Sequence, residues 1–313
     1  MWTAIQDFIT QHLGTASFGE LAFWDRVLVL IRDYGPSYIE GAWKTFLIAL
    51  ISTFFGCLIG LAVGIVQTIP ASSKDSPFKR GALKLVRIIL LCYVEIFRGT
   101  PMMIQAVFIY YGIPMVSEAF FGTPIFLDLW TSALLIVSIN TGAYMAETVR
   151  GGILSIDPGQ TEGAKAIGMT HVQTMLHVIL PQTLRNIMPQ IGNNLIINVK
   201  DTCVLFVIGV SELYSKHTIV AGAKYAFFES AMITMVVYLT MTVLLSRLLR
   251  WVEKKMEGSD SYDLATTDTL AHTTGMYSYP KRGSNFDERS IEYKETGPVS
   301  LEKGEVKGGG MRE

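Results

Sequence analysis

The run from about Ala42 to Ile69 most constrains the fold of this chain, because its one charged residue, Lys44, lies at its edge. A helix of about 20 apolar residues crosses the hydrocarbon core of a bilayer, so the run predicts a transmembrane helix. Half of the chain is hydrophobic and only 17% is charged, which is more apolar than a soluble domain of this length requires. We therefore expect an all-α integral membrane protein.

Four further segments have the length and composition of spans. They cover about 101–121, 126–146, 187–212 and 227–249. The stretch from Lys84 to Arg98 places its charges on one helical face, which indicates a segment in the membrane interface with the second crossing starting near Pro101. An alternative start near Leu85 would bury Glu95 and Arg98 in the bilayer, at a cost of several kcal/mol unless they are paired.

Basic residues fix the expected orientation. They are in excess over 70–98, in the loop after the third span and after the fifth span, and such loops stay in the cytoplasm. Five spans then place the N-terminus outside and the C-terminus inside. We expect an extracytoplasmic or interfacial lead-in at 1–37 with one amphipathic helix around 24–32, a membrane domain at 38–255, and a disordered cytoplasmic tail at 256–313.

Three glycines of the first span, Gly56, Gly60 and Gly64, recur at a four-residue spacing. This spacing makes a smooth strip where another helix can approach closely. Packing within this chain is the favoured interpretation, and a dedicated dimerisation face is the alternative.

A polar passage between the third and fourth spans begins with signals for a short helix. Asp157 suits the N-cap, Pro158 the first helical position and Gln160 the third. Gly168 suits the left-handed residue that closes a helix.

The same passage then predicts a second helix. Thr170 and Gln173 have the spacing of a capping box, and we expect their helix to run to about Leu180, where Pro181 kinks or ends it. The prediction is a cytoplasmic helical hairpin at about 151–185 with its tip near Gly168.

This hairpin resembles the EAA loop in permease subunits of ABC importers, through Glu162-Gly163-Ala164, Gly168 and Ile179-Leu180-Pro181. The chain is similar to the polar amino-acid permeases, which include the histidine and glutamine permeases. The resemblance covers about Tyr38 to Lys255 and includes FRGTPMMIQ (97–105), AYMAETVRGGI (143–153), GQTEGAKAIGM (159–169), ILPQ (179–182) and NVKDTCVLFVIGVSEL (198–213). Gly163 in place of the usual alanine, Cys203 in place of a common serine, and the long tail depart from the pattern.

The resemblance implies a type I ABC-importer permease fold in the bacterial cytoplasmic membrane, as a multi-pass protein in contact with lipid. It also implies a permease subunit of an ATP-driven amino-acid importer, paired with a second permease subunit of the same or a homologous chain. An extracytoplasmic binding protein would deliver the amino acid, and cytoplasmic ATPase subunits carrying ATP and magnesium would grip the hairpin. The expected coupling residues are Asp157, Glu162, Gly163, Ala164, Ala166, Gly168, Leu180 and Pro181.

The sequence shows no catalytic motif of its own. It lacks the GxxxxGK[ST] phosphate loop, HExxH, the GxSxG elbow and clustered metal ligands, so we expect a transport subunit with no cofactor or metal and no enzymatic activity. A net charge of −1 without a basic, aromatic-rich cluster argues against nucleic-acid binding.

Polar residues inside apolar spans face a cavity or another helix, and they are the candidates for the translocation path. An amino acid carries an ammonium and a carboxylate, which need acceptors and donors respectively when they leave water. Glu147 or Asp201 could meet the ammonium, and Lys200, Thr202 or asparagine amides the carboxylate. The complete candidate set is Gln105, Asn140, Tyr144, Glu147, Asn194, Asn198, Lys200, Asp201 and Thr202. Lys200 and Asp201 could instead serve helix packing or an internal ion pair, and Arg98 is interpreted as a structural residue.

Two other functions remain open at the level of sequence. A secondary amino-acid transporter or channel would more often show a duplicated, inverted half, which this sequence does not show. A membrane anchor or scaffold would act through the tail.

Overall fold

The computed structural model describes residues 2–13, 18–70 and 76–256, and all regular structure in these ranges is helical. The predicted tail, from residue 257 onward, lies outside them. The α-helices are α1 (Trp2–Leu13), α2 (Phe23–Thr68), α3 (Pro77–Gly99), α4 (Met102–Phe121), α5 (Leu129–Leu154), α6 (Pro158–Ala166), α7 (His171–Thr174), α8 (Leu180–Asp201), α9 (Leu213–Lys224) and α10 (Phe227–Met256). Two 3₁₀ segments lie at Phe18–Glu20 and Thr202–Ile208, and a π-helical turn lies at Met175–Ile179.

Five helical segments are long and apolar enough to cross a membrane, as predicted. They are Phe23–Thr68, Met102–Phe121, Leu129–Leu154, His171–Ile208 and Phe227–Lys255. The all-α membrane fold is therefore confirmed.

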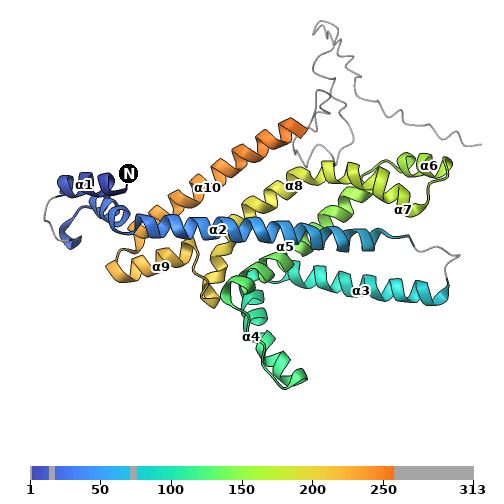
Figure 1. Cartoon of the computed structure of the whole chain (residues 1–313), viewed down its shortest axis with the longest axis horizontal. Coiled ribbons are helices and arrows are strands. Elements are labelled where there is room, and N and C mark those ends of the chain that lie inside the picture. Colours follow the sequence, from blue (N-terminus) through green and yellow to red (C-terminus); the bar gives the residue numbers. More distant parts are fainter. Residues whose placement is uncertain (1, 14–17, 71–75, 257–313) are drawn as a thin grey trace, which may run out of the picture. The chain divides into compact units, whose positions relative to one another are not determined.

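The pairing of α2 with α5 forms the centre of the bundle (Figure 1). The glycine strip faces α5: a Cβ at Gly56 would lie 2.6 Å from Thr141 Cβ, and one at Gly64 would lie 2.7 Å from a methyl carbon of Val149. Gly60 similarly lies against Met145. The four-residue glycine spacing therefore serves packing within this chain.

The first span starts earlier than predicted, because the expected amphipathic helix at 24–32 is continuous with it. Leu30 and Tyr38 are buried in a core that includes α9 and α10, so the apolar face does not stop at residue 42. Pro36 lies inside the helix and leaves the carbonyl of Arg32 without its usual N–H partner. The side-chain amide of Gln6 donates to that carbonyl at 3.1 Å, which offsets the lost bond.

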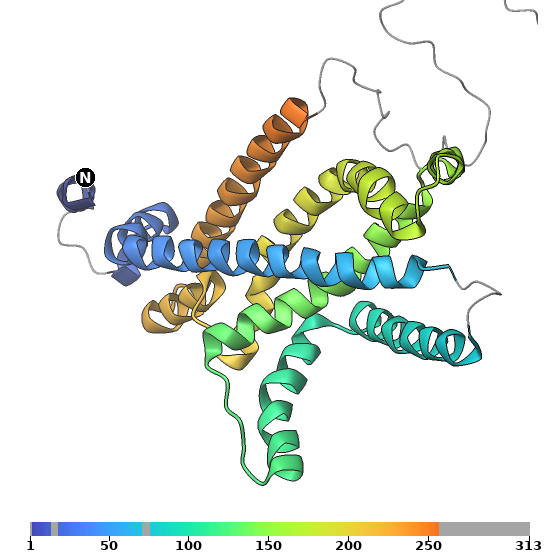
Figure 2. The ribbon, with the colours of Figure 1, turned by 45° about the vertical axis from the view of Figure 1, so that its right-hand side comes forward.

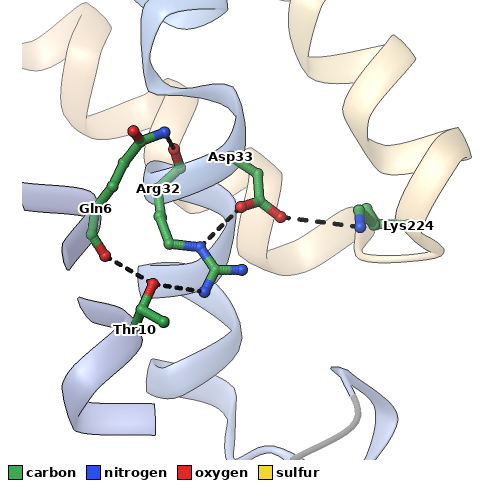
Figure 3. Close-up of polar contacts among 5 residues, drawn as sticks. All are labelled: Gln6, Thr10, Arg32, Asp33 and Lys224. Carbon is green, nitrogen blue, oxygen red and sulfur yellow. Dashed lines mark hydrogen bonds and ion pairs between the residues drawn. The ribbon is translucent and has the colours of Figure 1, made fainter. Parts of the chain in front are cut away.

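Helix α1 is tied to the bundle by a small polar network (Figure 3). Arg32 donates to the Thr10 hydroxyl at 3.3 Å and to Asp33 at 2.8 Å. Lys224, at the end of α9, lies 3.9 Å from the second oxygen of Asp33. The N-terminal helix is thus attached to α2, and the same part of α2 is joined to α9.

Helix α3 runs back beside the second half of α2, where Leu90, Tyr93 and Val94 pack against Ile59 and Val63. The chain then breaks at 100–101, as the sequence predicts, and α4 turns steeply away from α3 (Figure 2). The break follows from Pro101, which disfavours a helical conformation for the residue before it.

The third span ends later than predicted. Helix α5 continues to Leu154, so Glu147 lies two turns inside the helix and not at its end. Val149 and Ile153 are buried against Ile179 and Ile187, and this packing carries the helix beyond the predicted boundary.

The fourth span also differs from the prediction at both ends. The helix after Thr170 does not stop near Leu180, because a π turn, closed by the Leu180 N–H on the Met175 carbonyl, leads directly into α8. Such a turn accommodates the missing N–H of Pro181 without ending the helix. At the other end the helical segment stops at Ile208, because Gly209 has a φ of 89°. The fifth span begins at Phe227 as predicted and continues to Met256.

Candidate functional site

The first candidate site is the hairpin between α5 and α8, and its first helix is capped as predicted. The Asp157 carboxylate accepts from the Gly159 N–H at 2.7 Å. At the other end Gly168 has a φ of 83° and donates to Lys165 O at 3.0 Å, while Met169 donates to Ala164 O at 3.1 Å. These two bonds form a Schellman motif, so α6 is fixed at both ends.

The second helix starts with the predicted capping box. Gln173 N donates to the Thr170 hydroxyl at 3.3 Å, and Thr170 N donates to the Gln173 side chain at 2.9 Å. The side chain of Gln182, beyond the π turn, donates to Gln160 on α6 at 3.3 Å. This bond ties α6 to the start of α8.

The coupling candidates divide by exposure. Asp157, Glu162, Gly163, Ala166, Gly168 and Pro181 are exposed, Leu180 is half-buried, and Ala164 is buried and points inward.

Sequence reasoning missed three apolar side chains on the same hairpin: Ile167, Val172 and Leu176 are 79%, 63% and 53% exposed. A hollow of about 390 Å³ lies beside Gly168, with Ile167, Met169 and His177 in its wall. Apolar residues in an otherwise polar loop were the signal that could have identified this surface.

The second candidate site is a polar cluster at the C-terminal end of α3. The Arg98 guanidinium forms an ion pair with Glu147 and lies 5.5 Å from the ring centre of Tyr144. Arg98 and Glu147 side chains are 36% and 51% exposed, and Tyr144 is 42% exposed. Tyr144 and Glu147 share a face of α5, as predicted, and Arg98 joins them although the sequence assigned it a structural role.

Gln105 and Asn140 lie beside this cluster, but they serve the helix break. Gln105 donates to Thr100 O at 2.8 Å and to Phe97 O at 2.9 Å, which satisfies carbonyls that a helix end leaves free. Asn140 donates to the Gln105 side-chain oxygen at 2.8 Å. These two amides hold the break in place.

The translocation-path candidates on α8 lie away from the cluster around Arg98. Asn198 is buried and donates to the hydroxyls of Thr53 and Thr141 at 2.8 and 2.9 Å, which joins α2, α5 and α8. Asn194 donates to Gln190 O at 3.0 Å and also contacts the sulfur of Met145.

The last three candidates follow at the end of α8. Thr202 is buried and donates to Val199 O at 3.1 Å. Lys200 and Asp201 are exposed. The structure therefore brings Gln105, Asn140, Tyr144 and Glu147 together and does not bring the α8 candidates to them.

A buried carboxylate that the sequence analysis did not single out lies at the start of α9. Glu212 is fully buried and accepts from the N–H groups of Tyr214 and Ser215 at 2.9 and 2.8 Å, from the Tyr238 hydroxyl at 3.0 Å and from the Thr45 hydroxyl at 3.2 Å. Burial raises the pKa of Glu212, and these hydrogen bonds oppose the rise. The carboxylate joins α9 to α2 and α10.

Comparison with known proteins identifies the family. A family model described as "Binding-protein-dependent transport system inner membrane component" matches residues 80–258. The glutamine transport system permease of Escherichia coli K12 is 35% identical over 222 residues, covering 71% of this chain and 94% of that protein. The arginine transport system permease of Bacillus subtilis is 32% identical over 225 residues, covering 72% and 94%.

Solved structures agree. A crystal structure of an amino acid ABC transporter with histidines is similar, with a TM-score of 0.61 and 31% identity, and covers 75% of this chain and 99% of that one. The inward-facing MetNI methionine ABC transporter shares the fold at 23% identity, with a TM-score of 0.54, and covers 70% of this chain and 95% of that one.

These matches favour the permease interpretation over a secondary transporter or an anchor. Members of this family are multi-pass transport proteins of the bacterial inner membrane, and ATP hydrolysis belongs to a separate subunit. The chain belongs to the family of binding-protein-dependent transport system inner membrane components.

Proposed function

We propose that this chain forms the path by which an amino acid is imported and couples that path to an ATPase through the α6–α7 hairpin. The single observation that carries the proposal is the Arg98–Glu147 pair, a half-exposed cation and anion beside Tyr144. The names of the relatives, which are glutamine, arginine and other amino-acid permeases, support this substrate class.

The chemistry of the pair matches an amino acid. A substrate carboxylate can replace Glu147 as the partner of Arg98, and the substrate ammonium can pair with the released Glu147. Each charge then exchanges one partner for another, so no bare charge is left in a region of low dielectric. Gln105 and Asn140 support the site by fixing the helix break that carries Arg98.

The hairpin supplies the coupling surface. Its slim outer face presents the negative charge of Glu162 together with exposed Ile167 and Val172, and such a surface fits a cleft in a partner. ATP and magnesium bind the ATPase subunits and draw them together, the hairpins follow, and α5 and α8 tilt between inward and outward access.

The proposed assembly includes a second permease subunit, of the same or a homologous chain, and an external binding protein. The orientation we propose has the N-terminal segment and α9 outside and the hairpin inside. The excess of basic residues at 79–87 and at 247–255 supports this orientation. The lead-in at 1–37 and the tail at 256–313 are assigned to the outer and inner sides on the same basis.

Reconstitution tests the proposal. The chain is placed in proteoliposomes with its ATPase subunit and binding protein, and uptake of labelled glutamine, arginine and histidine is measured with and without ATP. We expect uptake of at least one of them that depends on ATP and on both partners. Uptake by the chain alone, driven by an ion gradient, would contradict the assignment.

The ion pair is tested in the same system. Because a lost charge-assisted contact costs at least about 1.4 kcal/mol, Glu147→Gln is expected to lower uptake about tenfold or more. Glu118→Gln, which removes an exposed carboxylate from α4, is the matched control and should leave uptake unchanged. Equal uptake by Glu147→Gln and wild type would remove the pair from the path.

A further inference from the structure

An apolar groove lies between α2 and α10, away from the hairpin and the polar cluster. It holds a cavity of about 400 Å³ between Ile39, Trp43 and Phe46 on α2 and Met241, Leu244 and Leu248 on α10. This volume is within the range of pockets that bind small molecules. We call this cavity the α2–α10 groove.

The groove is open on its outer side. Trp43, Leu244 and Leu248 are 59%, 65% and 54% exposed, and together they form its rim. From Met241 to Leu248 the groove follows α10 for about 10 Å, which is within one half of a hydrocarbon core about 30 Å thick. The groove is thus long enough to hold part of one acyl chain.

The end of the groove leads to a cluster of cations. Arg247, Arg250, Lys254 and Lys255 are all exposed, and none of them forms an ion pair with any other residue in the part of the chain that the structure describes. Lys255 lies 5.4 Å from the ring centre of Trp251.

The register of α10 places Lys255 on the face of the groove, Arg247 and Lys254 beside that face, and Arg250 on the far side of the helix. Trp251 and Lys255 follow Leu244 and Leu248 along one face, about 4.5 and 10 Å beyond Leu248 along the helix axis. Tryptophan and basic side chains in this position typically lie at the level of lipid headgroups. An occupant of the groove would therefore have its polar end near three positive charges, those of Arg247, Lys254 and Lys255.

We propose that the α2–α10 groove binds an anionic phospholipid of the phosphatidylglycerol type. One acyl chain fills the cavity, and the phosphate lies against Arg247 and the two lysines at the end of α10. Basic clusters beside a span attract anionic lipids by about 1 kcal/mol for each cation. The apolar groove and the exposed cations together match a molecule that carries both an acyl chain and a negative charge.

Native mass spectrometry of the full chain, purified in detergent and supplied with phosphatidylglycerol or phosphatidylcholine, tests this site. Two cations at about 1 kcal/mol each correspond to roughly thirtyfold in affinity. We expect clear preference for phosphatidylglycerol in the wild type, and a loss of about tenfold or more in its retention in Arg247→Gln/Lys255→Gln. The charge-conserving variant Arg247→Lys/Lys255→Arg should retain the lipid.

Two further variants separate the acyl-chain site from general charge attraction. Ala42→Phe places a ring in the groove, since Ala42 is part of its wall, and should release the lipid with no change in charge. Arg80→Gln/Lys84→Gln removes two exposed cations from α3 and should not change retention.

Three results would overturn the proposal. One is equal retention of the two lipids by the wild type, and another is an equal loss in the α3 control. The third is that Ala42→Phe releases a mass equal to one whole chain and not the mass of a lipid, which would identify a second copy as the occupant.

Discussion

Replacing Gly60 by alanine tests the packing at the centre of the bundle. A Cβ at this position would lie 2.7 Å from the carbonyl carbon of Met145 and 2.8 Å from the backbone nitrogen of Ala146. Both atoms belong to the backbone of α5, so no side-chain rotation can relieve the clash and α2 must move away from α5.

The expected magnitude follows from two opposing effects. Alanine favours a helix over glycine by up to about 1 kcal/mol, and overpacking costs about 1–3 kcal/mol. Because the obstacle is backbone we take the upper end of that cost, which leaves a net loss of about 2 kcal/mol. For a protein of this size the loss corresponds to a decrease of about 4–8 °C in Tm.

The assay is thermal unfolding of the purified chain in detergent, followed by tryptophan fluorescence. Gly112→Ala is the matched control, because Gly112 is also a helical glycine of a span but has no atom within 4 Å of the place that an added Cβ would take. Its Tm should stay equal or rise. A Gly60→Ala variant as stable as wild type would refute the close approach of α2 and α5.

Two further predictions concern buried amides and helix capping. Asn198→Leu removes the hydrogen-bond partner of the Thr53 and Thr141 hydroxyls, which costs about 1–3 kcal/mol for each hydroxyl. Its Tm should therefore be well below that of Asn193→Leu, an exposed control on the same helix. Equal Tm values for these variants would contradict the role of Asn198. Hydrogen bonds from the hydroxyl and N–H of Thr131 lower the pKa of Asp128. The Asp128 carboxylate therefore stabilises the first turn of α5 fully above its ordinary pKa of 3.8. This stabilisation is lost as the pH falls through the lowered pKa of the folded protein. Hydrogen-exchange protection of that turn, corrected for intrinsic rates, should decrease below about pH 4 in the wild type but not in Asp128→Asn, and a flat wild-type profile would refute the cap.

The features that were predictable from sequence are those with local causes. The spans follow from apolar length, and the hairpin follows from Asp157, Gly168 and Thr170, whose caps act within a few residues. The glycine strip was predictable as a packing face, although its partner helix was not, since spacing within one helix does not identify the helix that it meets.

The features that were not predictable depend on contacts distant in sequence. Helix α2 continues through Pro36 because Gln6, 26 residues before Arg32, compensates the lost backbone bond. Arg98 was assigned a structural role because nothing in the sequence indicates that the α3–α4 break brings it to Glu147, 49 positions later.

Asn198 makes a contact that the sequence could not assign. A polar residue in a span predicts a path or a helix contact with equal weight, and its bonds to Thr53 and Thr141 depend on helices that lie far apart in sequence. Pro181 was expected to kink or end its helix, whereas the π turn before it packs Ile179 against Val149 and Ile153 of α5, a contact distant in sequence.

The most direct test of the account is ATP hydrolysis by the reconstituted complex of this chain, its ATPase subunit and the loaded binding protein. Glu162→Lys reverses the one acidic charge on the outer face of α6 and is compared with Glu118→Lys, the same charge reversal at an exposed position of α4 outside the hairpin. We predict that both variants insert normally, that Glu118→Lys keeps stimulated hydrolysis and uptake, and that Glu162→Lys loses both. Unchanged hydrolysis and uptake in Glu162→Lys would contradict the claim that this hairpin couples the membrane path to the ATPase.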